Sequence, residues 1–163
     1  MSGIAAVGDC VLMSGVAAVE DYVLKTTCWR LRVDKRDVMQ AYNFEDLLIW
    51  QLSRTLVKDI YVQFSPNRDR DFNSQIQRAA VSIMNNIAEG FERSKNSKDN
   101  KQLLNFLNIS YGSCGEVRSM LYSAEDLGYI SSESALSLRN RCVDLSIKMK
   151  TFIEKLRDYD NTK

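Results

Sequence analysis

The chain has 163 residues, which is enough for one domain with a buried core. Apolar residues make up 45% and charged residues 26%, a balance that is ordinary for a globular protein and excludes a disordered one. The net charge is +1, so no global attraction to nucleic acid or to acidic membranes follows. A single proline and only seven glycines favour long helices over many short strands.

The chain contains no histidine, which excludes catalytic triads that use imidazole and metal sites with histidine ligands. Its four cysteines are far apart and form no CxxC pair, so a zinc site or a disulfide framework is not expected. We interpret Cys114 and Cys142 as small buried residues on helices, which suits a reducing, cytoplasmic compartment. No apolar run approaches the length of about 20 residues that crosses a bilayer. We therefore expect no metal, no cofactor and no membrane partner.

Residues 1–38 differ from the rest of the chain. The segment GIAAVGDCVLMS (3–14) is followed by an imperfect repeat, GVAAVEDYVLKT (15–26). Two copies of this length are too few for a solenoid. Three interpretations stay open: a loosely packed appendage, a short amphipathic docking segment, or translated sequence upstream of a functional start at Met39. We expect a poorly ordered extension over residues 1–38 and a folded domain over residues 39–163.

Four helices are expected after this extension. In the first helix Asn43 is the N-cap, and apolar residues recur every four positions from Leu48 to Ile60. This apolar face ends near Phe64. The polar segment 65–71, which contains the one proline, is expected to separate the first helix from the second.

The second helix is expected to start at Asn73 or Ser74, because Ser74 and Gln77 fit a capping box. Gly90 is expected to end the helix at the C′ position. Ile76, Ala80, Ile83 and Ile87 recur at helical spacing on one face. The opposite face carries a stripe of specific polar residues, which are Arg78, Ser82, Asn85 and Glu89.

Two interpretations of this polar stripe stay open. One is a solvated face with a local contact between Arg78 and Ser82 or between Asn85 and Glu89. The other is a partly buried polar network, with Arg78 paired to Glu89 or Glu116, that fixes one packing register. Such a network would be sensitive to the loss of one partner, because a buried charge is costly unless it is paired.

The third helix is expected to start from a cap at Ser97 and to run to Leu127, with Gly128 as its stop. Its apolar seam consists of Leu103, Leu107, Tyr111, Cys114 and Leu121. On another side of this helix lies a group of small and polar residues, namely Asn108, Gly112, Gly115 and Ser119.

Two glycines inside a helix cost about 1 kcal/mol each relative to alanine. Close approach of another backbone would offset that cost, and the neighbour is expected either inside the bundle or in another subunit. The residues that we assign to packing or assembly are Arg78, Ser82, Asn85, Asn86, Glu89, Gly112, Gly115, Glu116 and Ser119.

The fourth helix is expected to start at Ser131 or Ser132 and to continue to about Arg157. Much of its apolar pattern comes from Leu136, Val143, Ile147 and Ile153. Short connections between long helices make neighbours antiparallel. The sequence therefore predicts an all-α protein, an antiparallel up-down-up-down four-helix bundle.

Several separated motifs resemble one known family. QIQRAAVSIMNNIAEG (75–90) resembles the signature of the 23S ribosomal RNA intervening-sequence proteins, a group related to the accessory variability proteins of diversity-generating retroelements. Further matches follow in the same order: FEDLLIWQ (44–51), FERS (91–94), NFLNISYGSCGEV (105–117) and DLGYIS (126–131). The resemblance covers about residues 39–157. Where the family often has proline this chain has Met84 and Asn85, which puts a kink in the second helix in doubt.

The resemblance implies a left-handed up-down bundle and, as in studied relatives, a ring-shaped homopentamer. It implies no catalysis. Retroelement members of the group are associated with nucleic acid and with a reverse transcriptase. RNA or DNA, and a reverse transcriptase or another protein, are therefore candidate partners that the resemblance suggests.

The connector RSKNSKDNK (93–101) is the candidate site for nucleic acid, because it carries four cations against Asp99 alone. A lysine-bearing loop is usually just solvated, but a five-fold ring would present it five times and phosphate contacts accumulate. No aromatic stacking platform or base-reading motif is present, so any binding is expected to be non-specific. The candidate residues are Arg93, Lys95, Lys98 and Lys101, with Arg68 and Arg70 from the preceding loop.

The competing function is an oligomeric scaffold or protein-interaction module that binds no nucleic acid. Its surface would be the polar stripe of the second helix and the small-residue side of the third. An enzyme has the least support, since Glu89, Glu92 and Glu116 stand without a histidine, a set of metal ligands or a phosphate-binding loop. We expect a non-enzymatic, cytoplasmic protein.

Overall fold

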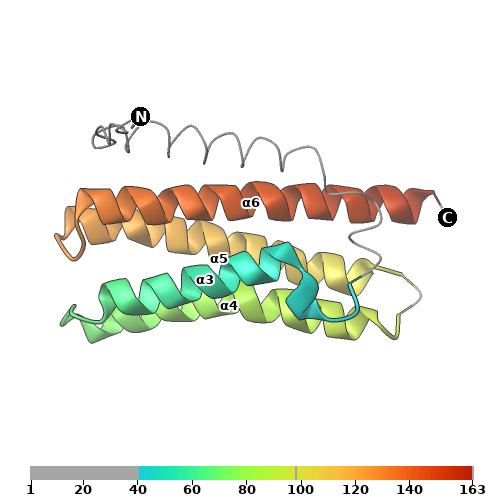
Figure 1. Ribbon diagram of the computed structural model, residues 1–163, viewed down its shortest axis with the longest axis horizontal. Coiled ribbons are helices and arrows are strands. Elements are labelled where there is room, and N and C mark those ends of the chain that lie inside the picture. The colour runs from blue at the N-terminus through green and yellow to red at the C-terminus, as the bar shows by residue number, and fades with distance from the viewer. Residues whose placement is uncertain (1–40, 98, 163) are drawn as a thin grey trace, which may run out of the picture. The chain divides into compact units, whose positions relative to one another are not determined.

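The computed structural model describes residues 41–97 and 99–162, and these residues form four long helices after one short 3-10 turn (Figure 1). The helices are α3 (Leu48–Phe64), α4 (Arg70–Ser94), α5 (Lys101–Asp126) and α6 (Ser132–Asn161). Successive helices run in opposite directions, so the predicted all-α up-down-up-down bundle is confirmed (Figure 1). The predicted poorly ordered extension, residues 1–38, lies outside the described residues.

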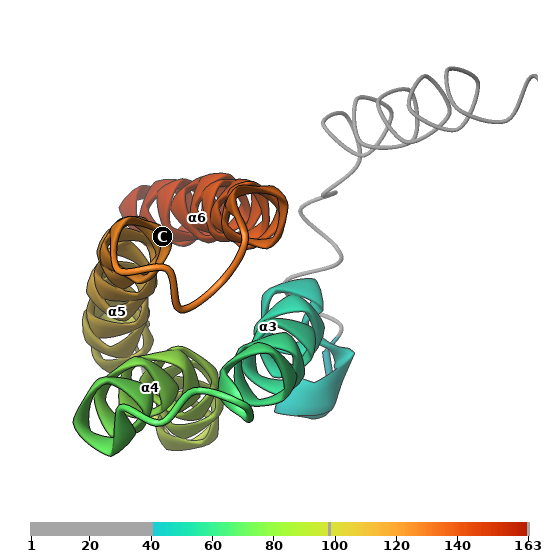
Figure 2. The same cartoon turned by 90° about the vertical axis from the view of Figure 1, so that its left-hand side faces the viewer.

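The helices follow one another around the bundle in chain order (Figure 2). Among neighbouring helices, α4 and α5 share the most extensive contact and α3 and α6 the least extensive one. Aliphatic side chains fill the interior, and each helix contributes several of them. The fully buried ones include Leu56, Ile60, Ile76, Ile83, Ile87, Leu107, Leu121 and Met149. None of the described helices is long and apolar enough to cross a membrane.

The chain enters α3 through the 3-10 turn Phe44–Asp46, so Asn43 caps this turn rather than the helix itself. The backbone N–H of Asn43 donates to the Asp46 carboxylate at 3.1 Å. The predicted apolar face is correct at Leu56 and Ile60, but Leu48 is 37% exposed. Ile49 and Ser53 take the inward positions instead, and Ser53 satisfies its hydroxyl by donating to the Ile49 carbonyl at 2.9 Å.

α4 begins one turn earlier than predicted, so the expected start at Asn73 or Ser74 is wrong. Asp69 is the N-cap, and its carboxylate accepts a hydrogen bond from the Phe72 backbone N–H at 2.9 Å. Asn73 closes the α3–α4 loop instead, because its side-chain amide donates to the Phe64 carbonyl at 3.1 Å.

Gly90 does not end α4, which continues to Ser94. Gly90 is buried, and a Cβ placed on it would lie 2.7 Å from the Cβ of Phe106 on α5. The residue is therefore a site of close helix approach rather than a helix stop.

Gly128 is confirmed as the stop of the third helix, because it has a φ of +68°. The Gly128 N–H donates to the Glu125 carbonyl at 3.0 Å, and the Tyr129 N–H to the Ala124 carbonyl at 2.9 Å, which is the Schellman pattern. The predicted start at Ser97 is wrong, since α5 begins at Lys101 after the N-cap Asn100.

The predicted apolar seam of α5 is correct except at Tyr111, which is 42% exposed. Ser110 takes the inward position next to it and donates its hydroxyl to the Ile83 carbonyl of α4 at 2.8 Å. A small polar residue fits there because its hydroxyl is satisfied by the neighbouring helix.

α6 begins at Ser132, one of the two predicted starts, and the hydroxyl of its N-cap Ser131 accepts from the Ser134 N–H at 3.2 Å. Its predicted inner face is largely wrong: Leu136, Val143 and Ile147 are 54%, 38% and 47% exposed. Ile153 is buried as predicted, and it faces the core together with a second set of apolar residues, namely Leu138, Cys142, Leu145, Met149, Phe152 and Leu156.

Candidate functional site

The α4–α5 connector lies at one end of the bundle, and its described cations are each held by a nearby carboxylate. Three ion pairs form, Arg93 with Glu89 at 2.6 Å, Lys95 with Glu92 at 2.8 Å, and Lys101 with Asp99 at 3.2 Å. Glu89 and Glu92 precede the segment 93–101, each about one turn before the cation that it pairs with, so the count of charges in that segment misses them. The predicted excess of positive charge is therefore largely offset locally. Lys98 lies outside the described residues.

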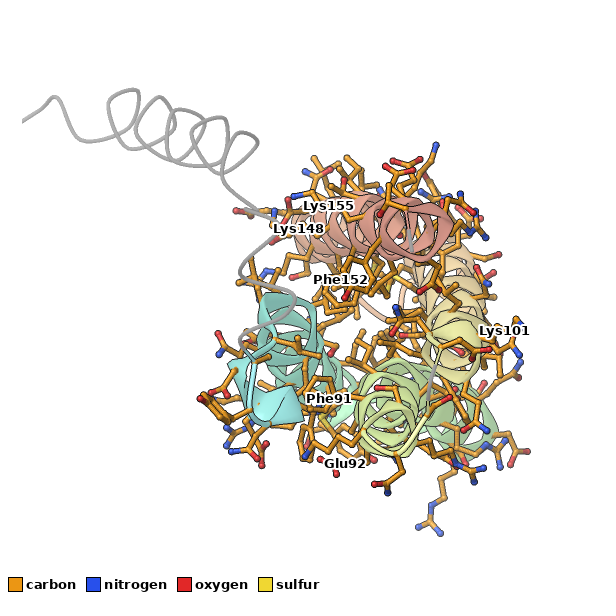
Figure 3. All side chains as sticks on the ribbon, turned by 90° about the vertical axis from the view of Figure 1, so that its right-hand side faces the viewer. Phe91, Glu92, Lys101, Lys148, Phe152 and Lys155 are labelled. Atoms are coloured by element: carbon orange, nitrogen blue, oxygen red, sulfur yellow. The ribbon has the colours of Figure 1, made fainter. Side chains whose placement is uncertain are left out.

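Aromatic rings lie beneath two of these cations. The Arg93 guanidinium is 5.2 Å from the ring centroid of Phe106, and the Lys95 ammonium is 5.1 Å from that of Phe91. Figure 3 shows Phe91 directed into the bundle, whereas Glu92 and Lys101 point away from it. The connector thus presents paired charges to solvent, whereas the aromatic rings beneath its cations belong to α4 and α5 and stay packed against the helices.

Arg68 and Arg70 lie at the opposite end of the bundle, in and just after the α3–α4 loop (Figure 1). At 1.5 Å per residue, Arg70 and Arg93 are separated by about 35 Å along α4. The six predicted nucleic-acid residues therefore do not form one surface. The length of α4 is the physical reason, because it carries the two loops to opposite ends.

The polar stripe of α4 does not form the predicted Arg78 pairs. Glu89 pairs with Arg93, its i+4 neighbour, whereas Arg78 and Glu89 are about three turns apart. Arg78 and Glu116 are both exposed, and neither forms an ion pair with any described residue.

A small hydroxyl and amide cluster joins the stripe to α5 instead. The hydroxyls of Ser82 and Ser113 are 2.9 Å apart, and the Asn86 side-chain amide donates to the Ser82 hydroxyl at 3.0 Å. Neither local contact considered from the sequence, Arg78 with Ser82 or Asn85 with Glu89, forms. The partly buried polar contacts of this face are therefore neutral rather than ionic.

Gly112 and Gly115 face open space. A Cβ placed on either glycine meets no heavy atom within 4 Å. The expectation that a helix of the same bundle approaches them is therefore wrong for the described residues. The other expectation, contact with another subunit, stays a prediction.

Exposed apolar side chains border these glycines on both edges of α5. At about 100° per residue, Ile109 lies on the edge next to α4, and Tyr111 and Tyr122 lie on the edge next to α6. These three side chains are 53%, 42% and 56% exposed. We call the outer face of α5 the surface formed by Asn108, Ile109, Tyr111, Gly112, Gly115, Glu116, Ser119 and Tyr122.

Tyr122 is held in place by α6. The guanidinium of Arg139 lies 4.2 Å from the Tyr122 ring centroid, and Arg139 also pairs with Glu125. The hydrogen bond from Arg139 holds the pKa of the Glu125 carboxyl below its usual value. Sequence reasoning missed Ile109, Tyr122 and Arg139, because their exposure depends on which face of each helix turns inward.

The two described cysteines fit the interpretation as buried core residues. Cys114 and Cys142 are free thiols with no solvent exposure, and the Cys114 thiol donates to the Cys142 carbonyl at 3.3 Å. The neighbouring Cys114 side chain, followed by burial, raises the pKa of the Cys142 thiol. Within residues 41–97 and 99–162, no group of three acidic or cysteine side chains is placed to hold a metal ion.

The family model of the 23S rRNA-intervening sequence proteins matches residues 45–151. The chain belongs to this family. A solved structure from the S23 ribosomal protein family of Bacteroides thetaiotaomicron, a protein of unknown function, matches with a TM-score of 0.59 at 20% identity. The match covers 65% of this chain and 98% of that one, and at this identity it shows the fold alone. Comparison with curated proteins gives no match.

The resemblance to the intervening-sequence proteins is thus confirmed. The matched range runs from the 3-10 turn to the last third of α6, so it includes both the connector and the outer face of α5. Both candidate surfaces of this intervening-sequence protein therefore belong to the family domain itself.

Proposed function

We propose that this family member is a non-enzymatic helical scaffold that assembles with copies of itself through the outer face of α5. The observation that carries the proposal is the exposure of Gly112 and Gly115, which meet nothing within the described bundle. Each glycine costs about 1 kcal/mol relative to alanine inside a helix. A helix of a second copy would offset this cost, because glycine lets another backbone approach closely.

The apolar edges of the outer face of α5 support the same proposal. Ile109, Tyr111 and Tyr122 place exposed apolar area on both sides of the glycines, and tyrosine is enriched in protein interfaces. The two edges differ in chemistry, since one carries Ile109 beside the exposed carboxylate of Glu116 and the other carries two tyrosines. Unlike edges favour a head-to-tail contact, which closes into a ring when the rotation between copies permits. A ring of five copies is the stoichiometry that the family resemblance implies.

A substitution in the middle of this face tests the proposal. Gly112→Leu places a branched side chain where the second copy would approach, so we expect the assembly to dissociate towards monomers in sedimentation velocity. Ser137→Leu is the matched control, because Ser137 is exposed on α6 and lies outside this face.

The control should keep the wild-type sedimentation coefficient, and both variants should keep the wild-type helical signal in circular dichroism. Equal sedimentation of Gly112→Leu and wild type at every concentration would remove the outer face of α5 as the contact.

Non-specific binding of RNA or DNA by the connector is a second candidate function. The observation that favours it is exposure: the Lys101 side chain is 82% exposed, and the Arg93 side chain 57%. Surface ion pairs contribute about 0–1 kcal/mol, so a phosphate can displace the carboxylates that hold these cations. A ring would repeat the connector in each copy and so multiply the phosphate contacts.

Protein partners outside the assembly are proposed by resemblance alone. A reverse transcriptase or another protein would be bound by the assembled scaffold, and the cytoplasm is the compartment that we propose for it.

A further inference from the structure

A shallow depression lies between the outer side of α4 and the end of α3. One wall comes from Tyr61 of α3, and the rest comes from consecutive turns of α4. The α4 residues that line it are Ser74, Gln77, Arg78, Val81, Ser82 and Asn85. This set includes three members of the polar stripe, and the bundle packing leaves the role of two of them, Arg78 and Asn85, open.

Most polar side chains of this depression have no partner in the part of the chain that the structure describes. Five of them make no side-chain hydrogen bond and no ion pair with residues 41–97 or 99–162, namely Tyr61, Ser74, Gln77, Arg78 and Asn85. All five can donate a hydrogen bond, and Arg78 carries a permanent positive charge. The lining contains no carboxylate.

This depression differs from the connector in its electrostatics. Arg93, Lys95 and Lys101 each have a carboxylate within 3.2 Å, so an anion must compete for them. Arg78 has no such competitor among the described residues, and it is surrounded by neutral donors. A cation would be repelled there, and an apolar ligand would leave several donors unpaired.

We propose that this depression binds a phosphate group. The guanidinium of Arg78 is the charged ligand, since its planar fork matches two phosphate oxygens. The hydroxyl of Ser74 and the side-chain amide of Gln77, which lie within about one turn of Arg78, supply neutral donors to the remaining oxygens. A phosphate uses donors on several sides better than a carboxylate does, because it has more acceptor oxygens.

The inference goes beyond the proposed scaffold function. The depression shares no residue with the outer face of α5 or with the connector. Self-association and phosphate binding can therefore fail independently. Gly112→Leu tests the first, and Arg78→Gln tests the second.

The experiment is a titration of the ¹⁵N-labelled full chain with inorganic phosphate at constant ionic strength, followed by nuclear magnetic resonance. We expect saturable shifts of the side-chain amide signals of Gln77, and the loss of these shifts in Arg78→Gln. Arg70→Gln is the matched control, because it removes the same charge from an exposed position of the same helix. The control should keep the shifts.

A second experiment distinguishes a phosphate of a nucleic-acid backbone from that of a small ligand. It measures the binding of a labelled oligouridine RNA by fluorescence anisotropy. If the group belongs to a nucleic-acid backbone, Arg78→Gln should weaken RNA binding about tenfold. The slope of log K against log salt should also fall by about 0.7, the value for one phosphate of a single strand. Phosphate shifts with unchanged RNA affinity would assign the site to a small phosphorylated ligand.

Two results would overturn the phosphate site. One is the absence of saturable shifts with inorganic phosphate. The other is an equal response of wild type, Arg78→Gln and Arg70→Gln, which would show that Arg78 has no special role.

Discussion

At the scale of single residues, the glycines of this bundle have three different roles. Gly128 adopts a positive φ and ends α5, Gly90 lets α4 and α5 approach, and Gly112 and Gly115 face open space. The sequence predicts the role of Gly128, because a helix stop depends on local conformation. It cannot predict the role of Gly90, because that role depends on Phe106, which lies on another helix.

Gly90→Ala is expected to destabilise the bundle. The added Cβ would lie 2.7 Å from the Phe106 Cβ and 3.2 Å from Leu103 Cδ1, so α4 and α5 must move apart. Overpacking of this kind lowers the free energy of unfolding by about 1–3 kcal/mol. Urea denaturation measures this change. Asn85→Ala, at an exposed position of the same helix, is the control and should keep the wild-type free energy of unfolding. Equal stability of Gly90→Ala and wild type would contradict the close approach.

Asp69→Asn is expected to weaken the loop end of the bundle in a pH-dependent way. Hydrogen bonds from the Phe72 N–H at 2.9 Å and the Tyr129 hydroxyl at 2.8 Å hold the pKa of the Asp69 carboxyl below its usual value. The stabilisation is therefore full at neutral pH. It is lost as the pH falls below the unfolded-state pKa of about 3.9 and through the lower folded-state pKa.

Urea denaturation at several pH values checks this sign. The difference between wild type and Asp69→Asn should be largest near neutral pH and should shrink in the acid range. A difference that stays constant as the pH falls would show that the charge of Asp69 contributes nothing.

At the scale of the helices, hydrophobic periodicity predicts their number and order but not always their inward face. α6 carries two sets of apolar residues at helical spacing, one on each side. The set with Leu136, Val143 and Ile147 is exposed, whereas Leu145 and Met149 are buried. Periodicity alone cannot choose between two such sets, because the choice depends on how α5 and α3 pack against the helix.

Neighbouring substitutions on α6 test which set faces the core. Leu145→Ala should lower the free energy of unfolding by about 2–5 kcal/mol, because Leu145 is 2% exposed and its loss leaves a cavity. Val143→Ala removes a side chain that is 38% exposed and should change stability much less. Thermal or urea denaturation measures both. A larger effect of Val143→Ala would mean that α6 is turned the other way.

At the scale of the whole molecule, the bundle topology decides which charges can act together. The sequence identifies the connector as a cluster of cations. In the structure, Glu89 and Glu92 pair with two of these cations, and Arg68 and Arg70 lie at the opposite end of the bundle. The pairs of Glu89 and Glu92 follow helical spacing and could be found from the sequence once α4 is known to continue past Gly90. The distance between the two loops could not be found until the helices were placed.

Charge reversal at the connector tests the second candidate function. The triple variant Lys95→Glu, Lys98→Glu and Lys101→Glu should weaken the binding of oligouridine RNA strongly, and the remaining binding should depend less on salt. The matched control reverses Lys58, Lys150 and Arg157, exposed cations of α3 and α6. Fluorescence anisotropy at several salt concentrations measures the binding. An equal loss in both triple variants would mean that net charge, and not the connector, determines binding.

The proposed scaffold function requires this intervening-sequence family protein to assemble with copies of itself. Static light scattering of the full chain, at micromolar concentration and in both low and high salt, tests it most directly. The proposal predicts a mass several times the 18.6 kDa of one chain, with five copies as the family resemblance implies. Because apolar side chains border the outer face of α5, the mass should persist in high salt. A mass of one chain in both salts would contradict self-assembly.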